Sequence, residues 1–293
     1  MKWMNLPEEH SSEDAKFVIL PIEYENDLTY RKGASKGPEE IIKASQYLEY
    51  YDEEFDCEAF ENGIKLLDYL KLKEKSPKEM IEIIASKIAE QKNKFVISLG
   101  GDHAVTIGIV KGLEVKGLKR LPENGSQDEE FSVIQFDAHA DFRDSWNGSE
   151  LNHACVAKQI SKNHNLLQIG IRSMDIDEMK QIKINENAHQ IKAREFSLEK
   201  IEQLLSKLKP KVYITIDVDV FDPSFIRNTG TPEPGGLTWQ EIIDALKLIF
   251  HNKEVIGTDI VEFSPNTNYQ AEAYSLAKLV YKLMSLQKLT IVK

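Results

Sequence analysis

The chain has 293 residues, 41% of them hydrophobic and 29% charged, and its 37 basic and 48 acidic residues give a formal net charge of −11. This acidity disfavours a nucleic-acid partner, because phosphate binding needs a basic surface, whereas it suits a small cationic ligand. No apolar run approaches the roughly 20 residues of a membrane span. The first ten residues show no secretory signal, and Cys57 and Cys155 form no clustered motif. We therefore expect a cytoplasmic protein without a membrane or nucleic-acid partner.

Short apolar runs alternate with helical patterns along the chain. Unbroken apolar runs are typical of strands that are buried on both faces, and apolar residues recurring every three or four positions are typical of helices. In chain order, the first half predicts strand Phe17–Ile22, loop Gly33–Pro38, helix Glu39–Tyr50, strand Ile64–Leu70, helix Pro77–Lys92, strand Phe95–Leu99, helix His103–Leu113 with Asp102 as its N-cap, and loop Lys119–Glu130. The second half predicts strands Phe131–Phe136, Leu166–Ile171 and Gln190–Arg194, helix Leu198–Leu208, strand Lys211–Ile216, helix Thr238–Phe250, strand Glu254–Glu262 and helix Tyr269–Leu286. This order predicts an α/β fold with a parallel sheet between two helical layers, and we expect residues 1–293 to form one domain.

Three of the predicted strands end in residue types that bind metals. The segments are Gly100-Gly101-Asp102-His103, Asp137-Ala138-His139-Ala140-Asp141 and Asp217-Val218-Asp219. In extended backbone, residues two apart point to the same side and lie roughly 6–7 Å apart. Because the carboxyl ends of parallel strands meet at one edge of a sheet, we expect these side chains to converge.

The converging set holds four carboxylates and two imidazoles, which suits a pair of divalent cations. Crowded carboxylates raise one another's pKa values unless cations neutralise them. Oxygen and imidazole ligands without thiolate favour a metal of the manganese type, and two such ions can share carboxylates and activate a water. A lone Asp-x-Asp at a strand end would indicate only a turn. Three such clusters, two of which contain a histidine, are not explained by turns.

At these residues the sequence resembles the ureohydrolase family of arginases and agmatinases. The matching segments are Thr29-Tyr30-Arg31-Lys32-Gly33-Ala34, Gly37-Pro38, Gly100–His103, Asp137–Asp141, Ile216–Pro223, Gly230-Thr231-Pro232-Glu233-Pro234-Gly235-Gly236 and Asp259-Ile260-Val261-Glu262-Phe263-Ser264-Pro265. The resemblance implies a three-layer α/β/α fold with a parallel sheet of about eight strands, and a homotrimer or homohexamer. It also implies two Mn²⁺ ions per subunit and hydrolysis of a guanidino group to urea and an amine.

The resemblance also implies roles for individual residues. One ion would be held by His103, Asp137, Asp141 and Asp217, and the other by His139, Asp137, Asp217 and Asp219, with Asp137 and Asp217 bridging. Three catalytic residues are implied. Glu262 would pair with the substrate guanidinium, Asp141 would pass a proton to the departing amine, and His153 would exchange protons with solvent. Taken alone, His153 could equally begin a helix and Glu262 could be a solvated strand-end charge.

The substrate is less sharply indicated than the reaction. Arginases read the amino-acid end of arginine through a Ser-Gly-Asn-Leu segment, where this chain has Ser149-Glu150-Leu151-Asn152. The added acid favours a second cation, so we expect agmatine, cleaved to putrescine and urea, with Glu150 or Asp144 as a contact for the distal ammonium. Alternatives are N1-aminopropylagmatine, guanidinobutyrate, guanidine or arginine as substrate, a dinuclear-metal phosphoesterase, and a catalytically silent metal-binding subunit. Nickel or cobalt could replace manganese.

Overall fold

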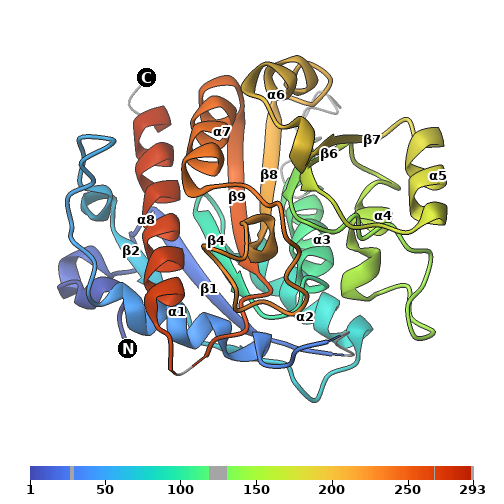
Figure 1. Cartoon of the computed structure of the whole chain (residues 1–293). Helices are drawn as coiled ribbons and strands as arrows, with labels where there is room; N and C mark the ends of the chain where they lie inside the picture. The colour runs from blue at the N-terminus through green and yellow to red at the C-terminus, as the bar shows by residue number, and fades with distance from the viewer. Residues whose placement is uncertain (27–29, 119–130, 267, 292–293) are drawn as a thin grey trace.

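In the computed structural model, which describes residues 1–26, 30–118, 131–266 and 268–291, the core is a wholly parallel sheet (Figure 1). The described residues contribute nine strands: β1 (Phe17–Glu23), β2 (Ile64–Leu66), β3 (Leu70–Lys71), β4 (Phe95–Gly100), β5 (Phe131–Phe136), β6 (Leu166–Ile171), β7 (Ala188–Lys192), β8 (Lys211–Asp217) and β9 (Glu254–Val261). Their order is β2-β1-β4-β9-β8-β5-β6-β7, and β3 also pairs with β1. The carboxyl ends of β4, β9, β8 and β5 are therefore neighbours.

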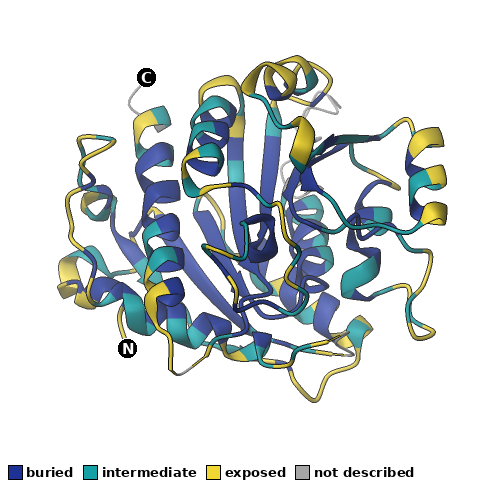
Figure 2. Ribbon diagram, viewed as in Figure 1, coloured by how far each residue is buried: buried dark blue, intermediate teal, exposed yellow. Residues whose placement is uncertain are grey.

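Helices cover both faces of the sheet. They are α1 (Gly37–Ser45), α2 (Pro77–Glu90), α3 (Val105–Leu118), α4 (Val156–Ile160), α5 (Ile176–Ile184), α6 (Leu198–Leu205), α7 (Trp239–Asn252) and α8 (Ala271–Ile291). One apolar core joins the sheet to α1, α6, α7 and α8, and the other joins it to α2, α3 and α4. Successive strand residues alternate between the two cores, as Ile19 and Val18 do in β1. Figure 2 shows these strands buried between the layers, and the predicted three-layer α/β/α fold is confirmed.

Several helices begin at capping boxes, in which a side chain and a backbone N–H at each end of the first turn bond reciprocally. Ser76 and Glu79 cap α2 in this way, and Thr238 and Glu241 cap α7. The same device starts α5, where Asp175 accepts hydrogen bonds from the first turn. The apolar pattern does not predict helices α4 and α5. α4 has five residues, too few to show a helical repeat, and α5 buries only Glu178 and Ile182 among its nine residues.

Some predicted boundaries are wrong for local physical reasons. The strand expected at Ile64–Leu70 is divided into β2 and β3. Leu67 still donates its N–H to Ile19, residues 68–69 then leave the sheet, and the chain pairs with β1 again at β3. The helix expected from His103 begins at Val105, since the Asp102 carbonyl and carboxylate close a preceding turn.

At α1 the helix ends at Ser45 and not at Tyr50. The Ser45 hydroxyl bonds back to the carbonyl of Ile42 and accepts the N–H of Met4, which fixes the helix end against the N-terminal segment. Thr29 and the loop expected at Lys119–Glu130 lie outside the described residues. Within the described part of the chain, no helix is both long and apolar enough to cross a membrane.

Candidate metal centre and active-site cleft

The eight residues singled out from the sequence lie together at the carboxyl end of the sheet. A cleft of about 390 Å³ opens there. The members that line it are His103, His139, Asp141, His153, Asp217, Asp219 and Glu262. Asp137 lies beneath the cleft, fully buried, with its carboxylate 3.2 Å from His103. The segments come from separate points of the chain, and the strand order β4-β9-β8-β5 brings them to one place.

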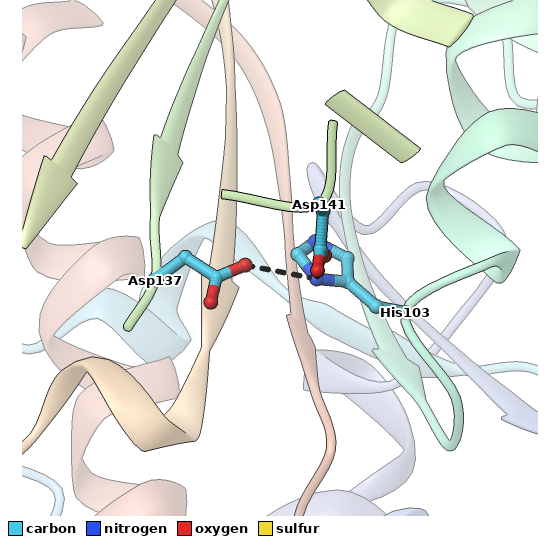
Figure 3. A group of neighbouring side chains, drawn as sticks. All are labelled: His103, Asp137 and Asp141. Atoms are coloured by element: carbon cyan, nitrogen blue, oxygen red, sulfur yellow. Dashed lines mark ion pairs between the residues drawn. The ribbon is translucent and has the colours of Figure 1, made fainter. Parts of the chain in front are cut away.

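The first group of potential ligands surrounds the His103 ring. Its Nδ1 atom lies 3.2 Å from Asp137 Oδ2, 3.2 Å from Asp141 Oδ2 and 3.4 Å from Asp217 Oδ2. In Figure 3 the side chains of His103, Asp137 and Asp141 point toward one another from two segments, one after β4 and the other after β5. Within the described residues this buried Nδ1 makes no hydrogen bond. The group has the donor atoms and the spacing that could hold a metal ion.

The second group forms around His139. Its Nδ1 atom lies 2.8 Å from Asp219 Oδ2 and 3.8 Å from Asp137 Oδ1, so Asp137 belongs to both groups. Backbone N–H donors orient the carboxylates: Ala138 donates to Asp219 at 3.0 Å and His139 donates to Asp137 at 2.7 Å. The side-chain amide of Gln135 donates to Asp137 Oδ2 at 2.6 Å. The carboxylates are thus held in place before any ligand arrives.

A buried network of hydroxyl groups stands behind His103. Its Nε2 atom lies 3.0 Å from Thr215 Oγ1, which in turn donates to Asp259 Oδ1 at 2.6 Å. Asp259 Oδ2 also accepts from Tyr213 at 2.7 Å and from Thr106 at 2.9 Å. Because Thr215 gives its proton to Asp259, it accepts at its oxygen the Nε2–H of His103. Nδ1 is therefore the ring nitrogen that faces the three carboxylates. Burial disfavours a charged imidazole, but these carboxylates, Asp137 foremost, outweigh it and raise the pKa of His103 well above its usual range, so a metal ion bound at Nδ1 would replace a proton.

Burial and mutual repulsion raise the pKa of three acids at the site, whereas the pKa of Asp219, which is also buried, is lowered by the neighbouring His139 imidazole. Burial, reinforced by Asp141 and Asp219, raises the pKa of Asp137 to about 7. Burial also raises the pKa of Asp217 well above its ordinary range, and that of Glu262 to about 8. Without cations these groups retain protons near neutral pH. Divalent cations could replace the protons and stabilise the carboxylate forms.

Two of the acids hold strained backbone conformations. Asp141 has φ = 50° and Glu262 has φ = 64°. Both values lie in the left-handed region, which residues other than glycine rarely adopt. Each such residue costs roughly 1–2 kcal/mol. The Glu262 N–H donates to the Gly101 carbonyl at 2.7 Å, which helps to hold this conformation. These conformations direct both carboxylates into the cleft. Strained backbone of this kind is often found at functional sites.

Glu262 and His153 lie beside the cluster. Glu262 Oε1 accepts the backbone N–H of His103 at 2.7 Å. His153 Nδ1 lies 3.8 Å from Asp102 Oδ2, at a short helical turn that Asn152 caps. Burial lowers the pKa of the His153 imidazole, but the nearby carboxylates, Asp102 foremost, outweigh it and raise the pKa to about 9. A charged imidazole is therefore favoured at the mouth of an acidic site.

Comparison with known proteins gives the chain its family. The sequence model of the arginase family matches residues 15–285. The chain belongs to the arginase family. This confirms the family that the motifs predict and, with it, an enzyme of the ureohydrolase type.

Curated relatives of this arginase-family chain have related names. It is 36% identical over 284 residues to the N(1)-aminopropylagmatine ureohydrolase of a Synechocystis species, covering 92% of this chain and 89% of the relative. It is 34% identical to the Thermus thermophilus protein of the same name, covering 94% and 92%, and 34% identical to the agmatinase of Pyrococcus horikoshii, covering 93% and 92%.

A solved structure, the agmatine ureohydrolase of Thermoplasma volcanium, superposes with a TM-score of 0.81 at 26% identity, covering 96% of this chain and 93% of its own.

The outer part of the cleft differs from the expectation for the substrate tail. Glu150 and Asp144, the expected contacts for a distal ammonium, are not among the lining residues and pair with Lys162 and Lys158 at the surface. The acids that do line the outer cleft are Asp175, Glu178 and Glu233. The sequence motifs predict a substrate contact for none of these acids, although Glu233 lies in the segment Gly230–Gly236 that resembles the family and Asp175 with Glu178 has capping-box spacing.

Proposed function

We propose that this chain is a dinuclear manganese enzyme that releases urea from a linear guanidinoalkylamine. The observation that carries the proposal is a pair of histidine–carboxylate groups that share Asp137 in a cleft next to Glu262. One ion would be held by His103, Asp137, Asp141 and Asp217. The other would be held by His139, Asp137, Asp217 and Asp219. Manganese is proposed because the donors are oxygen and imidazole nitrogen, without thiolate.

The residues present fit two cations. Four buried carboxylates, those of Asp137, Asp141, Asp217 and Asp219, crowd around two imidazoles. The His103 Nδ1 atom faces three of them without a hydrogen bond among the described residues. Replacing the protons of such a cluster with two divalent ions would remove the repulsion that raises the acid pKa values.

The reaction adds water to the guanidino carbon and breaks its bond to the alkyl nitrogen, giving urea and a free amine. When bound, a pair of divalent ions lowers the pKa of a shared water so that hydroxide is available near neutral pH. Glu262 would accept N–H groups of the guanidinium through charge-assisted hydrogen bonds and so fix the carbon in position. Asp141 would carry a proton to the departing nitrogen. His153 would exchange protons between the cleft and solvent.

For the substrate we place N1-aminopropylagmatine first, giving urea and the corresponding triamine, and agmatine second, giving urea and putrescine. The names of the Synechocystis and Thermus relatives support the first, and the name of the Pyrococcus relative supports the second. The sequence motifs alone had put agmatine first. We also propose the trimer or hexamer implied by the family resemblance, which light scattering after size-exclusion chromatography would test.

The test is urea release by the manganese-loaded protein across a substrate panel. N1-aminopropylagmatine and agmatine should be cleaved, and arginine, guanidinobutyrate and guanidine should be poor substrates. Asp137→Asn and Asp217→Asn should abolish both metal binding and urea release. A protein that takes up metal but releases no urea from any guanidino compound would be a silent subunit, and cleavage of a generic phosphate ester would favour the phosphoesterase alternative.

A further inference from the structure

Glu233 is the acid of the outer cleft whose carboxylate is least engaged by the rest of the protein. Its side chain is 37% exposed, and its carboxylate accepts no hydrogen bond from the described residues. The basic side-chain nitrogen among them that lies within ion-pair distance of the carboxylate is His139 Nε2, at 3.8 Å. Since His139 presents Nδ1 to Asp219 and Nε2 to Glu233, Glu233 lies on the outer side of the candidate metal centre.

The other two acids of the outer cleft are committed to the fold. Asp175 caps α5 through Oδ1 and pairs with Arg143 through Oδ2 at 2.7 Å. Both oxygens of Glu178 accept backbone N–H groups, those of Phe142 at 2.9 Å and Asp175 at 2.8 Å. The charge of Asp175 is thus already paired with a cation, and the Glu178 carboxylate is already oriented by two backbone donors, whereas among the described residues Glu233 has neither a backbone donor nor an ion pair as close as that of Asp175. Arg143, which could otherwise attract a carboxylate substrate, is itself neutralised by Asp175.

The loop that carries Glu233 is held rigidly relative to the metal centre. The Arg172 guanidinium donates to the Glu233 carbonyl at 2.8 Å and to the Asp219 carbonyl at 2.7 Å. Asp222 Oδ2 accepts the N–H groups of Gly235 and Gly236 at 2.9 and 3.1 Å. The backbone of Glu233 is therefore fixed while its carboxylate remains available to a ligand. A fixed backbone reduces the conformational entropy that is lost when a ligand binds.

We propose that Glu233 binds a cationic nitrogen in the tail of the substrate and so selects polyamine-like guanidino compounds. The inference rests on the proposed ureohydrolase function and adds to it a residue that determines specificity. A tail ammonium would donate N–H groups to the Glu233 carboxylate while the guanidinium lies at Glu262. A substrate with a carboxylate tail would meet a negative charge at this position, and a neutral tail would leave the acid without a partner.

The experiment compares Glu233→Gln with the unmodified manganese-loaded enzyme on two kinds of substrate. The amine substrates are agmatine and N1-aminopropylagmatine, and the matched compound is butylguanidine, which lacks the distal ammonium and is measured as a substrate or as a competitive inhibitor. For the amine substrates KM should rise roughly ten- to hundredfold with little change in kcat, the range expected for loss of a charge-assisted hydrogen bond. For butylguanidine, KM or the inhibition constant should stay within about twofold.

A control variant and the metal content separate this role from the alternatives. Glu150→Gln removes an acid that does not line the cleft and should change none of these constants, which excludes a general effect of net charge. If Glu233 only orients His139, then bound manganese and turnover of every substrate would fall together, and the proposal would be overturned. Unmodified enzyme that binds manganese but releases no urea would overturn the proposed function and this inference together. An active enzyme with unchanged KM in Glu233→Gln would overturn the inference alone.

Discussion

Thr215 links His103 to a buried acid, and replacing it with valine would test how the candidate metal centre is held. The Thr215→Val change keeps the shape of the side chain but removes the 3.0 Å contact with His103 Nε2, the 2.6 Å bond to Asp259 Oδ1 and a weaker 3.4 Å contact with the Thr106 hydroxyl. Asp259 would keep its bonds from Tyr213 and Thr106, so its carboxylate would not be left without donors. The imidazole would lose the partner that fixes which nitrogen carries the proton.

The size of the effect follows from these contacts. An unsatisfied buried donor or acceptor costs about 1–3 kcal/mol, so the free energy of unfolding should fall by about that amount. Losing a hydrogen-bond partner behind a metal-binding histidine typically weakens metal affinity by about 10–100-fold. We therefore expect manganese affinity to fall by about 10–100-fold, which corresponds to about 1.4–2.7 kcal/mol and is comparable with the expected loss of stability. At saturating manganese, most of the urea-releasing activity should return.

Manganese affinity would be measured by titrating the metal into each protein in a calorimeter, and urea release would be measured over the same range of manganese concentration. Thr258→Val is a matched control, because Thr258 is also buried in the sheet but its hydroxyl donates to the Asp259 carbonyl, at 3.4 Å, and to no side chain of the metal centre among the described residues. The control should lose stability without losing metal affinity. Equal manganese affinity in Thr215→Val and the unmodified enzyme would refute the idea that this hydroxyl orients His103.

Two further predictions concern stability and pH. Lys282→Met should lower the free energy of unfolding by about 3–5 kcal/mol in chemical denaturation, because it leaves the buried Asp52 carboxylate, 2.9 Å from the lysine Nζ, without its cation. The control Lys278→Met removes a more exposed charge, 3.7 Å from Glu53, and should cost under about 1 kcal/mol. Manganese affinity should rise with pH through neutrality, since the pKa of Asp137 near 7 means that its proton must leave when metal binds. Calorimetry in buffers of different ionisation enthalpy should register proton release, and pH-independent affinity between pH 6 and 8 would contradict this.

The sequence predicted the sheet well because most of its strands are unbroken apolar runs. The boundaries of β5 and β6 match the expected Phe131–Phe136 and Leu166–Ile171, since both strands are buried throughout. The divided strand at Ile64–Leu70 was missed because an apolar run does not show where the chain leaves a sheet. The helix α5 was missed because few of its residues are buried, although the Asp175 and Glu178 capping pair marks its start.

The site was predicted as far as short-range spacing and the family resemblance allow. The Asp-x-His-x-Asp and Asp-x-Asp spacings predict that the side chains converge, and in the structure they lie together. Contacts between distant segments could not be read in the same way. Thr215 and Asp259 are neighbours because β8 pairs with β9 in the register that places them opposite each other. Glu150 and Glu233 are both loop acids in the sequence, and the structure shows that the loop of Glu233 lines the cleft whereas Glu150 does not line it.

The most direct test of the dinuclear hydrolase account is anomalous diffraction from crystals of the active enzyme grown with manganese. The account predicts two manganese peaks, one beside His103 and the other beside His139, with Asp137 and Asp217 between them, in protein that releases urea. A fully active enzyme with one peak, or with none at these side chains, would contradict it.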